Sequence, residues 1–208
     1  MENRPIVLGS TSRYRKALLA RLGMPFETCA PYVDESPLDG EAPATTCERL
    51  ALAKARDVAA RYEHALVIGS DQVANANGVA IGKPGGRDEA IAQLARLSGR
   101  AIVFHTGVAL VDAASGRSHV ARIDVTTRFR TLAPATIEAY VDRERPFDCA
   151  GSIKSEGLGI ALVEAIDNAD PTALIGLPLI TVTDLLRREG FDVVTHAVRS
   201  PDSDDGSP

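Results

Sequence analysis

The chain of 208 residues lacks the features that mark membrane, secreted or disulfide-bonded proteins. It has no apolar run near the roughly 20 residues that a membrane-spanning helix needs. Its first residues form no apolar signal-peptide segment. The three cysteines are an odd number and far apart, which is typical of reduced thiols rather than of disulfides. These absences predict a cytoplasmic protein with no membrane partner.

Several common site types are also missing. The four histidines never stand at the spacing of metal ligands, and no two cysteines form a C-x-x-C motif. Nothing indicates a Ser-His-Asp triad, a Walker phosphate loop or a dinucleotide-binding glycine motif. The formal net charge of −5 argues against a general nucleic-acid surface. What remains is a chain of ordinary globular composition, with 45% hydrophobic and 25% charged residues.

Strand and helix patterns alternate along the chain and predict a mixed α/β or α+β fold rather than a purely parallel sheet. The length allows one domain over residues 1–199, built as two lobes, and residues 200–208 read as a disordered acidic tail. The expected strands are 6–8, 25–30, 65–69, 101–112, 119–130 and 160–166. The expected helices are 12–22, from Thr45 or Thr46 to about 61, 88–97, one that starts at Pro134, and 177–189. A tight hairpin is expected around Asn77-Gly78, and the long acidic loop 31–46 suggests function.

The first strand leads into a turn that favours an anion. Ser10 and Ser12 follow the glycine that ends the strand, and an amphipathic helix begins directly afterwards. Such a turn directs backbone N–H groups and the positive end of a helix dipole at one spot. Arg15 adds a planar, permanently charged fork where a helix start disfavours cations. The cluster therefore predicts a phosphate site.

Charged residues stand beside three other turns. Asp71 follows a strongly apolar strand, Lys83 lies in a Gly-Lys-Pro turn, and Glu35 lies on the long acidic loop. Lys154 occupies a Gly- and Ser-rich turn over residues 150–157. Carboxylates suit a hard divalent cation, while lysine and arginine neutralise phosphate charge. Together these residues indicate a site for a magnesium–triphosphate substrate.

Four ordered blocks resemble the Maf family of nucleoside-triphosphate pyrophosphatases, and the resemblance covers residues 6–189. The blocks are Ser10 to Arg15, Val33 to Glu35, the pair 69–72 and 82–84, and residues 149–157; Gly176-Leu177-Pro178 matches a further signature. The resemblance implies a two-lobed α/β fold with a central cleft, related to the inosine-triphosphate pyrophosphatases. It is also compatible with a homodimer.

The resemblance further implies hydrolysis between the α and β phosphates with a divalent cation, Mg²⁺ or Mn²⁺. Asp71 is then the proton acceptor that activates water, and Glu35 and Asp71 lie near the metal. Ser10, Arg15 and Lys83 are implied to hold phosphates, and Lys83 and Glu35 to belong to the catalytic set.

Three positions separate the branches of the family, and here they are Tyr14, Gln72 and Lys154. An aromatic residue with Gln and Lys is similar to the branch that hydrolyses 7-methyl-GTP, although Tyr14 departs from the expected Trp. A methylated, cationic purine stacks well on an aromatic face. Gln72 can offer a donor and an acceptor to base edges. Lys154 can reach either a phosphate or the guanine carbonyl.

Two other functions remain as alternatives. One is the dTTP/UTP pyrophosphatase branch, which tends to have Arg, Thr and Gln at the three positions. The other is a nucleotide-binding regulator of septum formation, a label that some relatives carry. Asp71, Lys83 and Glu35 together weigh against binding alone, because a sensor needs no activated water.

Overall fold

The computed structural model describes residues 4–197. One mixed sheet of seven strands runs through it in the order β2-β1-β3-β5-β6-β7, with β4 paired to β3. β1 pairs parallel with β2 and β3, whereas the remaining pairs are antiparallel. The predicted mixed α/β class is confirmed. The predicted tail at 200–208 lies outside the described residues.

The strands are β1 Ile6–Gly9, β2 Glu27–Cys29, β3 Leu66–Ala76, β4 Val79–Ile81, β5 Ala101–Asp112, β6 Ser118–Phe129 and β7 Val163–Asp167. The helices are α1 Arg13–Ala20, α2 Pro43–Ala59, α3 Arg87–Leu97, α4 Pro134–Glu144, α5 Leu179–Arg188 and α6 Val193–Ala197. Three short 3₁₀ turns lie at η1 Ala150–Ser152, η2 Leu158–Leu162 and η3 Ala173–Ile175.

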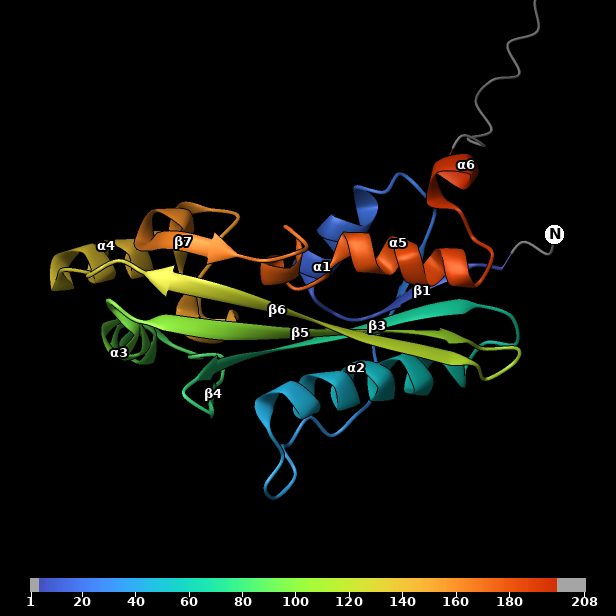
Figure 1. Ribbon diagram of the computed structural model, residues 1–208, viewed down its shortest axis with the longest axis horizontal. Helices are drawn as coiled ribbons and strands as arrows, with labels where there is room; N and C mark the ends of the chain where they lie inside the picture. The colour runs from blue at the N-terminus through green and yellow to red at the C-terminus, as the bar shows by residue number, and fades with distance from the viewer. Residues whose placement is uncertain (1–3, 198–208) are drawn as a thin grey trace, which may run out of the picture.

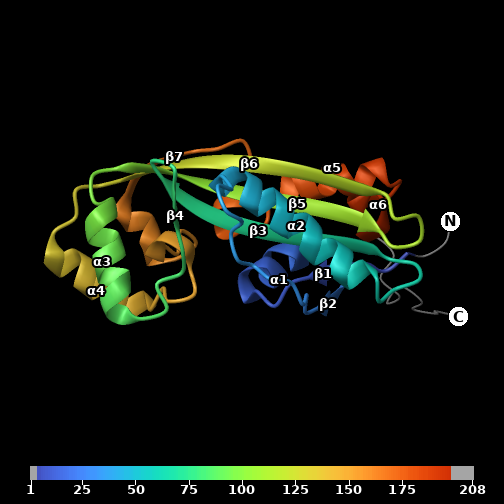
Figure 2. The same ribbon diagram turned by 90° about the horizontal axis from the view of Figure 1, so that it is seen from below.

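The long strands β3, β5 and β6 run through the centre of the molecule (Figure 1). Helix α2 covers one face of the sheet, and α1 and α5 cover the other. Seen from the α2 side, α3 and α4 lie together at one end of the long strands (Figure 2). Helix α2 is thus the only long helix on its face among the described residues.

Helix α2 lies unusually close to the sheet because two strand positions have no side chain. A Cβ on Gly69 would lie 2.3 Å from the Ala51 carbonyl oxygen, and one on Gly107 would lie 2.4 Å from the Cys47 carbonyl oxygen. No real Cβ tolerates such contacts, so glycine is required at both positions. The close approach decides what side chains of α2 can reach.

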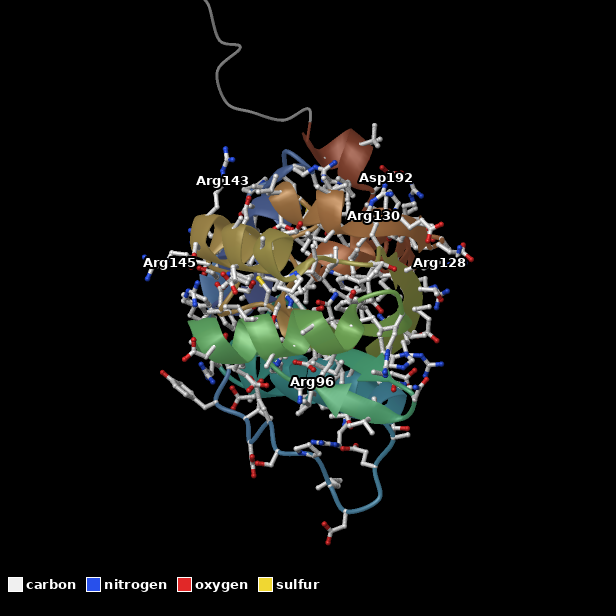
Figure 3. All side chains as sticks on the ribbon, turned by 90° about the vertical axis from the view of Figure 1, so that its left-hand side faces the viewer. Arg96, Arg128, Arg130, Arg143, Arg145 and Asp192 are labelled. Carbon is white, nitrogen blue, oxygen red and sulfur yellow. The ribbon has the colours of Figure 1, made fainter. Side chains whose placement is uncertain are left out.

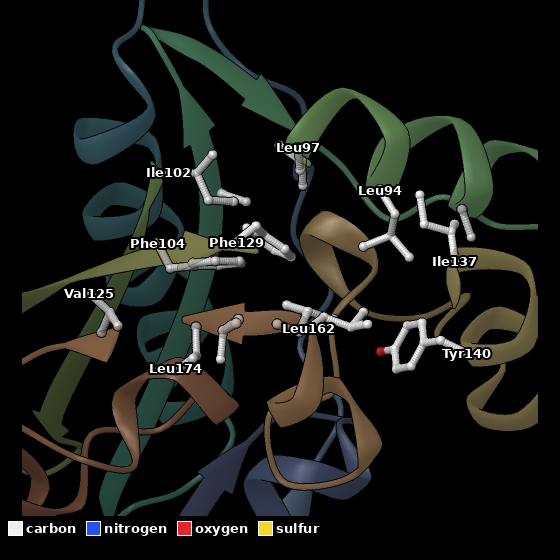
Figure 4. Packing of buried hydrophobic residues seen from close by; sticks show 14 of the residues in the cluster. Leu94, Leu97, Ile102, Phe104, Val125, Phe129, Ile137, Tyr140, Leu162 and Leu174 are labelled. Carbon is white, nitrogen blue, oxygen red and sulfur yellow. The ribbon is translucent and has the colours of Figure 1, made fainter. Parts of the chain in front are cut away.

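Apolar clusters pack on both sides of the sheet and at its α3–α4 end. At that end, side chains from α3, α4, β5 and β6 interlock around Phe104 and Phe129 (Figure 4). Burial of such side chains is the main source of stability. The same end is charged on its outside, where the labelled arginines point away from the core (Figure 3): Arg96, Arg128, Arg130, Arg143 and Arg145. No helix in the described part of the chain is long and apolar enough to cross a membrane.

Most expected elements are present, and four differ. Strand β3 does not end at Gly69 but continues through Asp71 to Ala76, because it pairs with β5 along its length. Helix α2 begins at Pro43, not at Thr45 or Thr46, since proline suits the first turn. Residues 160–162 belong to η2 rather than to a strand, and α6 was not predicted.

Candidate active site

One cavity of about 670 Å³ gathers segments that lie far apart in the sequence. Its walls come from the β1–α1 turn, the loop before α2, α2 itself, β3, the β4–α3 turn, residues 148–156 and η3. Eight of the nine residues predicted for the site line it: Ser10, Ser12, Tyr14, Arg15, Glu35, Asp71, Gln72 and Lys83. Lys154 does not.

The β1–α1 turn forms one wall and has the geometry expected of an anion site. Ser12 is the N-cap of α1, and its Oγ accepts from the Arg15 backbone N–H at 3.4 Å. Ser10 Oγ accepts from the Ser12 N–H at 3.1 Å. The first turn of α1 contains no acidic residue to balance the helix dipole.

Arg15 is held by backbone rather than by a carboxylate. Its Nε donates to the Gly176 carbonyl at 2.9 Å, and its Nη1 lies 3.5 Å from Ser10 Oγ. Burial lowers the pKa of Arg15, and the charges of Asp71 and Glu35 oppose this. In the described part of the chain Arg15 forms no ion pair. Its cation is therefore available to an anion in the cavity.

Elsewhere in the cavity lining, three charged side chains form one cluster. The Lys54 ammonium lies 2.7 Å from Asp71 Oδ1 and 2.8 Å from Glu35 Oε1. Lys54 and Asp71 are nearly buried, with side chains 6% and 10% exposed, whereas Glu35 is 57% exposed. A lysine in such a place needs its partners, because burial of an unpaired charge is costly.

Lys54 is a site residue that the sequence analysis missed. It stands on the apolar stripe of α2, between Leu50 and Ala51 on one side and Ala55 and Val58 on the other. The sequence did contain a signal for Lys54, because a lysine among the apolar residues of an amphipathic helix faces the core. The helix can bring it to Asp71 because Gly69 and Gly107 let α2 approach the sheet.

Successive side chains of β3 point to opposite faces of the sheet. Asp71 points toward α2, whereas Ser70 and Gln72 contact η3 and the loop after it. Ser70 Oγ donates to the Gly107 and Gly176 carbonyls. Gln72 Nε2 lies 3.0 Å from the Ala173 and Leu174 carbonyl oxygens and from Thr106 Oγ1.

The geometry of Gln72 corrects one expectation. Its amide nitrogen was expected to donate to a base edge, but both of its hydrogens are directed at acceptors of the protein. Only the side-chain oxygen of Gln72 is left for a ligand. The donor is used up because η3 packs against β3 and presents its carbonyl oxygens there.

Tyr14 lies at another part of the cavity, beside Asp148 and Cys149. Its hydroxyl donates to Asp148 Oδ1 at 3.2 Å, and the Arg13 guanidinium lies 4.8 Å from the ring centroid. Burial raises the pKa of Tyr14, so the phenol stays neutral. Burial also raises the pKa of the Cys149 thiol to about 12, which makes this cysteine a poor nucleophile.

Lys154 has a structural position outside the cavity. Its ammonium donates to the Glu144 carbonyl at the end of α4, and its backbone N–H donates to Tyr140 Oη at 2.9 Å. A cation at the end of a helix is favoured by the dipole. Two residues later in the same turn, Glu156 does line the cavity. The turn therefore contributes Glu156 to the cavity lining, whereas the Lys154 side chain is bonded to the end of α4.

The carboxylates of Glu35 and Asp71 suit a divalent cation only when a bound phosphate supplies further oxygen ligands. No group of three or more His, Cys, Asp or Glu side chains among the described residues can hold a metal. Glu35 and Asp71 supply two carboxylates, and Mg²⁺ commonly binds one or two carboxylates together with substrate phosphates. The donor set thus fits a metal that enters with a polyphosphate.

The chain is similar to known proteins over most of its length. A model of the Maf family, described as Maf-like protein, matches residues 5–189. A Polaromonas protein named 7-methyl-GTP pyrophosphatase is 55% identical over 90% of this chain and 86% of its own. Proteins of the same name from Thiobacillus denitrificans and Burkholderia lata are 51% and 54% identical, over 91% and 89% of this chain and 94% and 90% of their own. With the family model matched from the first strand to the end of α5, the chain belongs to the Maf family.

Proposed function

We propose that this protein hydrolyses 7-methyl-GTP to 7-methyl-GMP and diphosphate. The observation that carries the proposal is one cavity shared by the Arg15 cation and the Asp71–Lys54–Glu35 cluster. Within residues 4–197, Arg15 has no carboxylate partner. The names of relatives that are about half identical over most of the chain support the choice of substrate.

The polyphosphate is held by groups from separate turns. Ser10 and Ser12 offer hydroxyls beside the N-terminus of α1, and Arg15 offers a charged fork. Lys83, an exposed residue on the turn after β4 that also lines the cavity, adds a second cation. These groups neutralise phosphate charge as it shifts during the reaction.

Asp71 is the proposed proton acceptor. It removes a proton from water, the water oxygen bonds to the α phosphorus, and the bond from that phosphorus to the α–β bridging oxygen breaks. Diphosphate leaves with the electron pair of this bond. Lys54 fixes Asp71 by the 2.7 Å contact to Oδ1, which leaves Oδ2 for the water. A divalent cation at Glu35 and Asp71 would supply further charge neutralisation on the phosphates.

The purine is proposed to lie against Tyr14. N7-methylation makes the ring a cation, which is attracted to an aromatic face by about 1–2 kcal/mol when water is excluded. Glu156 also lines the cavity, and its carboxylate can accept from the N–H edge of guanine or offset the ring charge. We propose Glu156 for the role that the sequence analysis gave to Lys154.

The proposal is tested by diphosphate release from a panel of triphosphates with Mg²⁺ or Mn²⁺. We expect 7-methyl-GTP to be hydrolysed with the highest kcat/KM, above GTP, UTP and dTTP. Preference for UTP or dTTP would place the protein in the other branch. Tight binding of nucleotides with no turnover would favour the regulator of septum formation.

A further inference from the structure

The loop between β2 and α2, residues 30–42, carries Glu35 but contains neither helix nor strand. Glu35 itself is more than half exposed, and Lys54 is its ion-pair partner. A carboxylate on an irregular segment keeps a defined position only if the backbone beside it is fixed. Two sets of contacts hold the backbone of this loop.

The start of the loop is attached to the C-terminal half of α2 and to Arg61, which follows the helix. The Tyr32 N–H donates to Asp57 Oδ2 at 2.9 Å, and Arg61 Nη1 donates to the Ala30 carbonyl at 2.8 Å. The Arg61 guanidinium also lies 4.6 Å from the centroid of the Tyr32 ring. These contacts end three residues before Glu35.

The second attachment is a bidentate pair between Arg49 of α2 and Glu41. Arg49 Nε and Nη2 donate to the two oxygens of Glu41 at 2.6 and 2.7 Å. The same Nη2 donates to the carbonyl of Ser36, the residue after Glu35, at 3.1 Å. One guanidinium therefore joins α2, the end of the loop and the backbone next to Glu35.

Glu41 is fully engaged in this arrangement. Its Oε2 also accepts from the Leu38 N–H at 3.2 Å and from Thr46 Oγ1 at 3.0 Å, and its side chain is only 6% exposed. The hydrogen bonds from Arg49 lower the pKa of Glu41 to about 2. Glu41 lines the cavity, but its oxygens are occupied by protein donors rather than offered to a ligand.

We propose that Arg49 and Glu41 are positioning residues for the reaction: they hold the backbone at residue 36 so that Glu35 stays against Lys54 and Asp71. The proposal rests on the function proposed above. Arg49 acts through Ser36 and Glu41, and it is not among the residues that line the cavity. An arginine is needed because lysine cannot contact both oxygens of Glu41 and the Ser36 carbonyl in one plane.

The test uses Arg49→Gln and Arg49→Lys in the full chain, assayed with 7-methyl-GTP over a range of Mg²⁺ concentrations. We expect kcat of Arg49→Gln to fall about 10-fold to 100-fold, because a displacement of about 1 Å in a catalytic group has that effect. The KM for nucleotide should change less than about threefold, since the phosphate-holding residues are untouched. The Mg²⁺ concentration for half-maximal activity should rise, and Arg49→Lys should lie in between.

Hydrogen–deuterium exchange of residues 34–38 gives a readout that does not depend on activity. Exchange there should be faster in Arg49→Gln than in the unmodified chain, with α2 unchanged. The matched control is Arg87→Gln, which removes a similar fork to Asp142 (2.6 and 3.0 Å) outside the cavity and should leave kcat unaltered.

Each result decides between explanations. An unchanged kcat and unchanged loop exchange in Arg49→Gln would overturn the positioning role, as would a loss that merely follows the fraction of folded protein. An unmodified chain that hydrolyses no triphosphate would overturn the proposed function instead. The exchange of residues 34–38 would then still show whether Arg49 holds this segment.

Discussion

The molecule contains two clusters of buried charge that use similar groups in different ways. At the hairpin end of β5 and β6, Glu189 accepts from Arg117 Nε and Nη2 at 2.8 Å each and from His119 Nε2 at 2.7 Å. Its side chain is 1% exposed, and it lines no part of the cavity. In the cavity, by contrast, one ammonium is shared between two carboxylates.

The difference lies in which oxygens have partners. Both oxygens of Glu189 are bonded to cationic donors of the protein, so this carboxylate has no capacity left for a ligand. Asp71 and Glu35 are each contacted through one oxygen, and both lie at the cavity wall. A satisfied cluster stabilises the fold, whereas a partly satisfied one beside a cavity can bind and react. Four predictions, made with three substitutions, test this comparison.

The largest effect is expected from Asp71→Asn. The amide keeps the shape of the side chain but cannot take a proton, so kcat should fall about 100-fold to 10,000-fold. The melting temperature should fall as well, because Lys54 then keeps only the exposed Glu35 as a charged partner, so kcat is measured on the folded fraction. Activity above about a tenth of the original would remove Asp71 from the proton-acceptor role.

A loss of stability with no loss of chemistry is expected from Glu189→Gln. Removing the charge weakens the bonds from Arg117 and His119, and the free energy of unfolding should fall by about 2 kcal/mol. Urea denaturation measures this change. The kcat of the folded fraction should be unaltered at 25 °C, and a tenfold drop would show that the two clusters are coupled.

A smaller change is expected from Tyr14→Ala, which tests the base end of the cavity. If the ring stacks on the cationic purine, the ratio of kcat/KM for 7-methyl-GTP over that for GTP should fall about fivefold to thirtyfold. Tyr14→Phe is the control, because it keeps the ring and loses only the hydroxyl, which contacts Arg13, Asp148 and Cys149. Equal losses on both substrates in Tyr14→Ala would contradict stacking.

The smallest effect concerns acid stability. Hydrogen bonds from Arg117 lower the pKa of Glu189 below its usual 4.5. Stability from this group is therefore present above pH 4.5 and is lost as pH falls through the lower folded-state pKa. In Glu189→Gln the free energy of unfolding should depend less on pH between about 5 and 3 than in the unmodified chain. Parallel curves for the two proteins would assign the acid sensitivity to other carboxylates.

The local patterns of the sequence predicted most elements because each carries its own signal. Asn77 and Gly78 have positive φ values of 53° and 86° in the turn between β3 and β4, as the hairpin pattern required. Ser12 caps α1, and Pro134 begins α4. Pairing between strands overrode the local signal at Ser70-Asp71-Gln72, which continues β3.

The site was predicted in part for the same reason. Ser10, Ser12 and Arg15 belong to one turn, so their proximity could be read from spacing alone. Lys54 was missed because its importance depends on the distance between α2 and the sheet, which two distant glycines determine. Lys154 was predicted for the site because it belongs to the matching block of residues 149–157. In the structure its ammonium instead donates to the Glu144 carbonyl at the end of α4.

The sequence by itself determined the class of fold, the strand–turn–helix arrangement around Ser10 to Arg15 and the family resemblance, since these depend on neighbouring residues and local hydrogen bonds. Only the tertiary structure decided which oxygens and cations are left for a ligand. Partner choice depends on packing: α2 brings Lys54 to Asp71, η3 takes up the amide hydrogens of Gln72, and Arg49 holds the loop beside Glu35. A buried charged group can bind a ligand only where packing leaves part of its bonding capacity without a protein partner.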